Sequence, residues 1–207
     1  MIMQNYIQRL LLVLIAATMT ITANALDHPK AVLPTLSPER FTLVEAGQPV
    51  PILLSQTEDK AILHAADNLV EDFERVTGMK PVLSDKISSG RVIVIGSLGS
   101  PYVKEMVSRG KFSTAELEGR NEKYLIQTVM EPLEGIAEAL VIAGSDRRGV
   151  VYGIYEISEQ IGVSPWYDWM DVPVKEYMPH DCTMKAVTAK AATTQTVANI
   201  VLSNLIS

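Results

Sequence analysis

Three consecutive residues, Asp146, Arg147 and Arg148, are the candidates for anion recognition in this sequence. Two guanidinium groups beside the start of a helix can hold a carboxylate through paired N–H donors. The same residue types also suit a helix N-cap, in which the Asp146 carboxylate accepts from the first free N–H groups and the arginines stay solvated. We favour the capped helix and keep carboxylate binding as the alternative.

An aromatic cluster, Trp166, Tyr167 and Trp169, lies further along and contains both tryptophans of the chain. Aromatic faces stack on sugar rings, and Asp168 and Asp171 lie close enough in sequence to bind sugar hydroxyl groups. The alternative is an aromatic plug that closes one end of the domain. A catalytic pair of these two aspartates is a weaker hypothesis, because glycosidase carboxylates must face each other across the substrate.

Other motifs carry less chemistry. The turn 96–100 precedes a helix that begins at Pro101, as in phosphate-binding loops, but the dinucleotide fingerprint and the P-loop pattern are absent, which favours a plain glycine turn. His64 has no second ligand at helical spacing, and Cys182 is the only cysteine. We expect no catalytic residue, metal ion or cofactor in this chain.

The elements that position these residues follow from hydrophobic periodicity. Strands are predicted at 41–45, 50–54, 81–83, 91–95, 124–129 and 139–143, and helices at 57–77, from 101 and at 147–161. Thr57 is the predicted N-cap of the first helix, and Gly78 and Gly162 are predicted C-terminal ends. A short turn joins the last two strands, which predicts antiparallel neighbours. The fold class is therefore α/β, with a mixed β-sheet and helices packed on it.

The amino terminus has the features of a secretory signal peptide over residues 1–25. Arg9 supplies the positive region, 10–17 is apolar, and Ala23-Asn24-Ala25 is a suitable cleavage site. We expect an exported protein, periplasmic or extracellular, that has no membrane contact after signal cleavage. Residues 26–40 are proline-rich and read as an extended lead-in. The net charge of −6 argues against nucleic acid as a partner.

The character of the sequence changes after the predicted domain, residues 41–173. Residues 178–207 contain only one acidic residue, Asp181, and 186–196 are mostly alanine and threonine. This segment either forms a weak amphipathic helix or is an aberrant, poorly ordered tail outside the original fold.

Three segments together resemble a known family. They are Arg91-Val-Ile-Val-Ile-Gly96, Ala139 to Gly149 with its Gly-Ser-Asp-Arg-Arg-Gly ending, and Tyr152-Gly-Ile-Tyr-Glu-Ile-Ser-Glu-Gln-Ile-Gly-Val-Ser-Pro-Trp-Tyr167. They are similar to the N-terminal domain of glycoside hydrolase family 115, the xylan α-glucuronidases, over roughly residues 41–173. The resemblance implies the non-catalytic α/β domain that precedes the barrel in such exo-glycosidases.

The resemblance also implies a division of labour. In this family a (β/α)-barrel carries most of the active site, and inverting hydrolysis removes (4-O-methyl)glucuronic acid from glucuronoxylan. The resemblance ends near Met178, so we expect a truncated chain whose missing barrel is its intramolecular partner and which is inactive alone. A stand-alone carbohydrate-binding module and a non-functional remnant are the alternatives. The residues expected on the substrate side are Asp146, Arg147, Arg148, Trp166, Tyr167 and Trp169.

Overall fold

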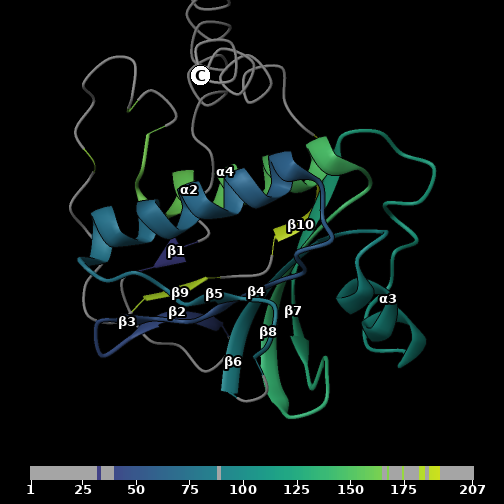
Figure 1. The fold of residues 1–207 in the computed structure, drawn as a ribbon, viewed down its shortest axis with the longest axis horizontal. Coiled ribbons are helices and arrows are strands. Elements are labelled where there is room, and N and C mark those ends of the chain that lie inside the picture. Colours follow the sequence, from purple (N-terminus) through teal and green to yellow (C-terminus); the bar gives the residue numbers. More distant parts are fainter. Residues whose placement is uncertain are drawn as a thin grey trace, which may run out of the picture. The chain divides into compact units, whose positions relative to one another are not determined.

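The computed structural model describes residues 32–33, 40–87, 90–164, 167, 174, 182–184 and 187–191. The predicted signal peptide, most of the lead-in and most of the segment 178–207 lie outside these residues. The described part is a mixed β-sheet with helices packed on it, which confirms the predicted α/β class (Figure 1). None of its helices is long and apolar enough to cross a bilayer.

The main sheet has six strands in the order β10-β7-β8-β6-β4-β5. Their bounds are β4 Ile52–Leu54, β5 Leu83–Ser84, β6 Gly90–Ser97, β7 Lys123–Met130, β8 Ile136–Gly144 and β10 Val187–Ala191. Strands β5, β4, β6 and β8 run parallel, whereas β7 is antiparallel to β8 and β10 is antiparallel to β7. The predicted antiparallel pairing of 124–129 with 139–143 is therefore confirmed.

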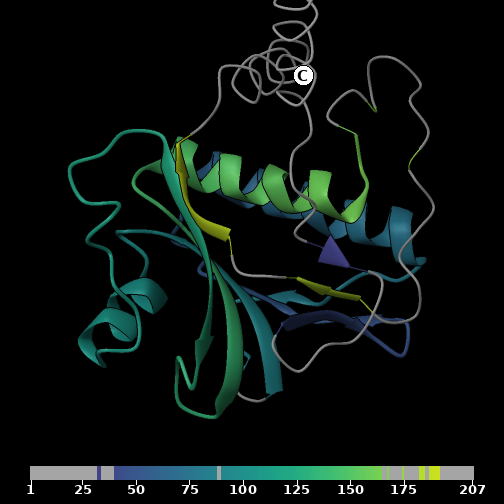
Figure 2. The same cartoon turned by 180° about the vertical axis from the view of Figure 1, so that it is seen from behind.

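Helices cover the two faces of this sheet. On one face lie α2 (Lys60–Thr77) and α4 (Arg147–Ile161), and on the other lies α3 (Pro101–Ser108) (Figures 1 and 2). Side chains that alternate along β6 contribute to a core on each face of the sheet. Ile93 and Ile95 belong to the core under α2 and α4, while the intervening Val94 belongs to the core under α3. A strand that is buried on both faces accounts for the continuous apolar run in the sequence.

A smaller sheet has the order β1-β9-β2-β3. Its strands are β1 (Val32–Leu33), β2 (Phe41–Glu45), β3 (Gln48–Pro49) and β9 (Cys182–Met184). Ala46 and Gly47 join β2 to β3 with positive φ angles at both positions, as a tight hairpin turn requires. Val187–Ala191, where a weak amphipathic helix was one alternative, is instead strand β10, because its backbone pairs with β7.

The helix ends agree with the sequence at three of four predicted positions. Asp146 caps α4, and Gly78 and Gly162 take the left-handed conformation after α2 and α4. The predicted N-cap of α2 is wrong, because Asp59 rather than Thr57 accepts the capping hydrogen bond, from Ala61 N–H. The Thr57 hydroxyl is instead hydrogen bonded to Ser55 at 2.8 Å, so it cannot serve as the cap.

Candidate functional site

A hollow of about 400 Å³ lies at the carboxyl ends of the parallel strands. The segments that follow β4, β6 and β8, residues 57–59, 97–100 and 145–147, line it together with Ile62. The chain passes from β4 to α2 on one face of the sheet and from β6 to α3 on the other. Open α/β sheets commonly bind ligands where neighbouring connections diverge in this way, which makes the hollow the candidate site.

Glu58 binds the turn 96–100, which resembles a phosphate-binding loop in sequence. Its carboxylate accepts from the backbone N–H of Ser97 at 3.0 Å and from the Ser97 hydroxyl at 3.0 Å. The Ser97 hydroxyl in turn accepts from Gly99 N–H at 3.2 Å. An internal carboxylate thus binds the donors that a phosphate would need, which supports the plain glycine turn over an anion site.

Asp59 and Arg147 join the amino-terminal ends of α2 and α4. The Asp59 carboxylate accepts from Ala61 N–H at 2.9 Å, and Arg147 Nη1 lies 3.5 Å from its other oxygen. The backbone hydrogen bond from Ala61, with a further contribution from Arg147, holds the pKa of Asp59 below its ordinary value. Both side chains are well exposed, so this ion pair contributes little stability.

Asp146 ties the start of α4 to the start of β7. One carboxylate oxygen accepts from Gly149 N–H at 2.8 Å, and the other accepts from Glu122 N–H at 2.9 Å. Arg148 Nη1 is 2.6 Å from a carboxylate oxygen of Glu122, an interaction that raises the pKa of the arginine. Glu122 itself has a positive φ of 54°, which is uncommon for a residue with a side chain. These contacts favour the capped helix predicted from the sequence.

Replacing Asp146 with alanine is expected to lower the free energy of unfolding by about 2 kcal/mol, because two backbone N–H groups lose a charged acceptor together. Urea denaturation followed by far-UV circular dichroism measures this. Asp59→Ala is the matched control, since the Asp59 carboxylate caps α2 by accepting from a single backbone N–H of the described residues, that of Ala61. If Asp146→Ala lowers the free energy of unfolding by no more than Asp59→Ala does, the two backbone hydrogen bonds of Asp146 do not both stabilise the fold.

Tyr167 lies near the other end of α4. The guanidinium carbon of Arg75, in the last turn of α2, is 4.7 Å from the centroid of its ring. Helix α4 has 15 residues and is therefore about 22 Å long, so Tyr167 is separated from Asp146 by that helix. One sugar ring therefore cannot contact both Tyr167 and the group Asp146 to Arg148. Trp166, Trp169, Asp168 and Asp171 lie outside the described residues.

Several polar contacts at this edge were not predictable from local sequence patterns. The Glu58–Ser97 contact joins residues that are 39 positions apart, and the Glu122–Arg148 contact joins residues that are 26 positions apart. No local pattern predicts such pairs. In the part of the chain that the structure describes, no group of three His, Cys, Asp or Glu residues is placed to hold a metal ion.

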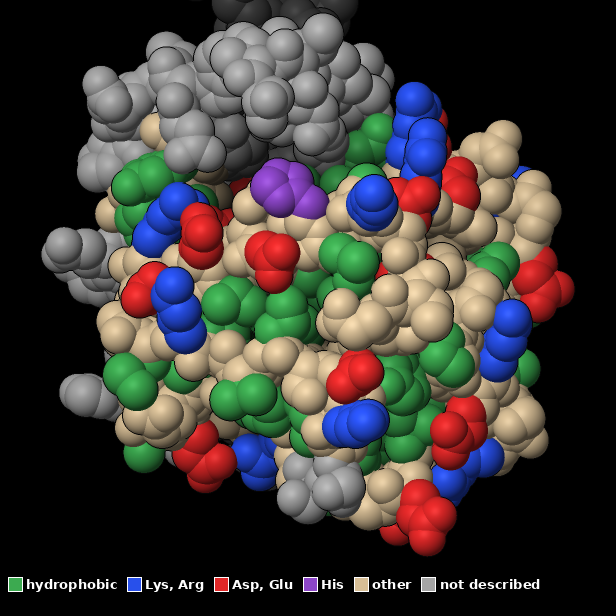
Figure 3. Space-filling model, in the orientation of Figure 1, with side chains coloured by type: hydrophobic (Ala, Val, Ile, Leu, Met, Phe, Trp, Pro, Cys, Tyr) green, Lys and Arg blue, Asp and Glu red, His purple; other side chains and the backbone are tan. Residues whose placement is uncertain are grey.

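The surface around α2 carries charges of both signs. Figure 3 shows acidic and basic side chains interspersed on this face, with hydrophobic side chains between them. His64 is exposed on α2, as expected for a residue off the apolar stripe. A face with mixed charges has no strong field of one sign that would attract a polyanion.

Comparison with known proteins relates this chain to solved structures. No protein-family model and no curated protein sequence matches this chain. Among solved structures, the chain is similar to a family GH115 4-O-methyl-α-glucuronidase with specificity for decorated arabinogalactans, at 25% sequence identity and a TM-score of 0.57. The match covers 72% of this chain and 18% of that enzyme, so the chain spans less than a fifth of its relative. The described fold is therefore like part of a family-115 glucuronidase.

Proposed function

We propose that this chain is the α/β accessory domain of an exported glycoside hydrolase of the family-115 α-glucuronidase type. The observation that carries the proposal is the shared fold at 25% identity over 72% of the chain. The similar enzyme is described as specific for decorated arabinogalactans, and the sequence resemblance points to the xylan α-glucuronidases. The proposed substrate class is accordingly a plant polysaccharide with (4-O-methyl)glucuronic acid side groups.

The polar groups of the hollow support an accessory role rather than catalysis. Inverting hydrolysis needs one carboxyl group as acid and another as base on opposite faces of the sugar. Glu58, Asp59 and Asp146 each accept from backbone N–H groups of this domain. These three carboxylates already accept hydrogen bonds that hold loops and helix starts in the folded protein, so we do not assign them the role of catalytic acid or base. The acid and base would then come from another domain of the complete enzyme.

We further propose that the domain meets the substrate or the catalytic domain through 146–148 or through 166–169, but not through both on one sugar ring. A complete family-115 glucuronidase provides the test, by substitution of the positions that align with Arg148 and Trp166. A fall in kcat/KM on glucuronoxylan is expected for at least one of them. Substitution at the position aligned with Lys104, which is exposed on α3, is the control. Wild-type kinetics in both variants would remove this substrate-side proposal.

A further inference from the structure

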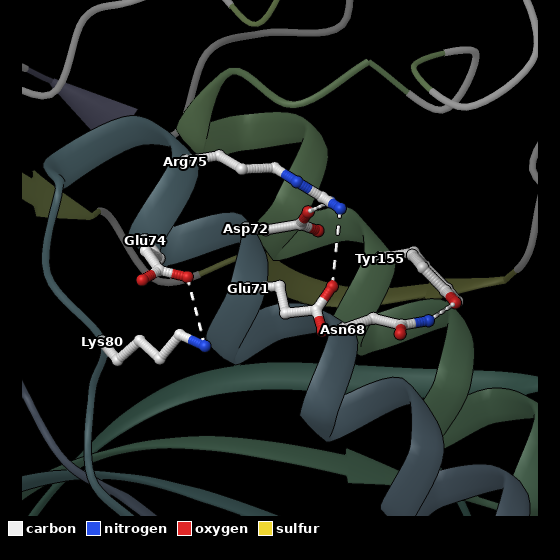
Figure 4. A network of polar contacts seen from close by, with 7 residues as sticks. All are labelled: Asn68, Glu71, Asp72, Glu74, Arg75, Lys80 and Tyr155. Atoms are coloured by element: carbon white, nitrogen blue, oxygen red, sulfur yellow. Dashed lines mark hydrogen bonds and ion pairs between the residues drawn. The ribbon is translucent and has the colours of Figure 1, made fainter.

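Arg75 occupies a distinctive place at the end of α2. Its guanidinium Nη1 is 2.7 Å from Asp72 Oδ1, and its Nη2 is 3.4 Å from Glu71 Oε2 (Figure 4). The same guanidinium lies over the ring of Tyr167, with its carbon 4.7 Å from the ring centroid. One arginine thus connects two carboxylates of its own helix to an aromatic residue that follows α4.

Asp72 orients the guanidinium group of Arg75. It is 4% exposed, on the face of α2 that is packed into the domain, whereas Glu71 is exposed to solvent. A buried carboxylate needs a charged or hydrogen-bonding partner, so its bond to Arg75 is far more constraining than the longer contact with Glu71. The planar guanidinium can accept an aromatic ring against its face while its edge donates to a carboxylate.

Tyr167, which receives this contact, is six residues beyond Ile161, the last residue of α4. Its ring packs partly buried against the core that lies between the sheet and the helices α2 and α4. Two backbone hydrogen bonds organise the intervening chain, from Val163 N–H to Ser158 O at 3.0 Å and from Tyr167 N–H to Ser164 O at 2.9 Å. Val163 and Tyr167 are therefore each held by a backbone hydrogen bond, and the ring of Tyr167 lies against Arg75.

We infer that Arg75 is a positioning residue, oriented by buried Asp72, that holds Tyr167 against the end of α2 and so fixes where the chain after α4 contacts that helix. These contacts are present in the isolated domain and are independent of the proposed function. It assigns a specific task to a helix residue whose ion pairs would otherwise suggest only helix stability.

The test is backbone hydrogen exchange of the full chain, followed by mass spectrometry of peptides that cover 163–167. Tyr167→Leu keeps apolar bulk but removes the ring, and the exchange of these amides is expected to become about fivefold faster, the ratio for a lost contact of about 1 kcal/mol. Asp72→Asn should accelerate the same amides although Asp72 lies on α2, because it orients Arg75. Tyr167→Phe keeps the ring and should exchange at the wild-type rate.

Two controls separate positioning from general destabilisation. Glu74→Gln breaks the Glu74–Lys80 ion pair, 3.2 Å long, on the same helix and should leave 163–167 unchanged (Figure 4). Peptides of β6 and β8 report global opening in every variant. Unchanged exchange in Tyr167→Leu, or equal acceleration in Tyr167→Phe, would overturn the inference. If Asp72→Asn does not fold, the comparison of the two Tyr167 variants decides alone.

Discussion

Gly149→Ala is expected to destabilise the domain by about 3 kcal/mol, even though it places a better helix-forming residue in the first turn of α4. A Cβ at this position would lie 2.3 Å from the carbonyl oxygen of Lys123, which is a backbone atom. That carbonyl also accepts from Ser145 N–H at 2.8 Å, so it is held from the side of β8. Helix propensity alone would give a gain of about 1 kcal/mol, and the collision outweighs it.

Urea denaturation followed by circular dichroism decides between the two effects. Gly99→Ala is the matched control, because its Cβ would meet only the Ser97 hydroxyl at 3.4 Å and its φ is not positive. The control should change the free energy of unfolding by no more than about 0.5 kcal/mol. A Gly149→Ala protein that is as stable as the wild type would mean that α4 does not approach β7 as closely as described.

Tyr124→Phe is expected to lower the free energy of unfolding by about 2 kcal/mol at neutral pH. The Tyr124 hydroxyl donates to Glu156 Oε2 at 2.8 Å, and Gln160 Nε2 donates to the other carboxylate oxygen at 3.0 Å. Both Tyr124 and Glu156 are buried between β7 and α4. Removal of the hydroxyl takes a strong donor from a buried carboxylate, and water has little access to replace it.

The pH dependence of this difference has a definite sign. Burial, followed by the charge of Glu156, raises the pKa of Tyr124 well above the ordinary value of 10.0. Below pH 10 the hydroxyl is protonated in both states and its contribution is complete. Above pH 10 the unfolded tyrosine ionises while the folded one stays protonated, so stability from this residue falls by about 1.4 kcal/mol per pH unit.

The gap between wild type and Tyr124→Phe should therefore narrow between pH 10 and pH 11. Burial also raises the pKa of Tyr102 and Tyr152, but those residues are present in both proteins and their effect cancels in the comparison. Urea denaturation at pH 8, 10 and 11 measures the gap. A gap that stays constant over this range would contradict the placement of the Tyr124 hydroxyl against Glu156.

Local patterns predicted much of the fold because its elements depend on local chemistry. Asp146, Gly78 and Gly162 were recognisable as helix ends from residue type and position, and all three serve so. The apolar run at 91–95 was recognisable as a buried strand because β6 faces a core on both sides. The prediction of Thr57 as the N-cap of α2 was wrong, because the turn of the chain after β4 brings its hydroxyl within hydrogen-bond distance of Ser55 instead.

Contacts between residues far apart in the chain could not be predicted from local sequence patterns. The two groups of substrate-side candidates lie on either side of one helix in the sequence, and that helix, about 22 Å long, separates its cap Asp146 from the end near which Tyr167 lies. The alanine- and threonine-rich composition near residue 187 gave no strand signal, since β10 is defined by its pairing with β7 rather than by its own propensity.

The most direct test of an accessory role is release of glucuronic acid by the purified chain, residues 26–207. Glucuronoxylan and a glucuronic-acid-bearing arabinogalactan are the substrates, a complete family-115 glucuronidase is the positive control, and circular dichroism establishes that the chain is folded. We expect no release above the buffer control from a folded protein. Release that depends on the chain would contradict the accessory role, because it would show that this small domain contains a working acid and base of its own.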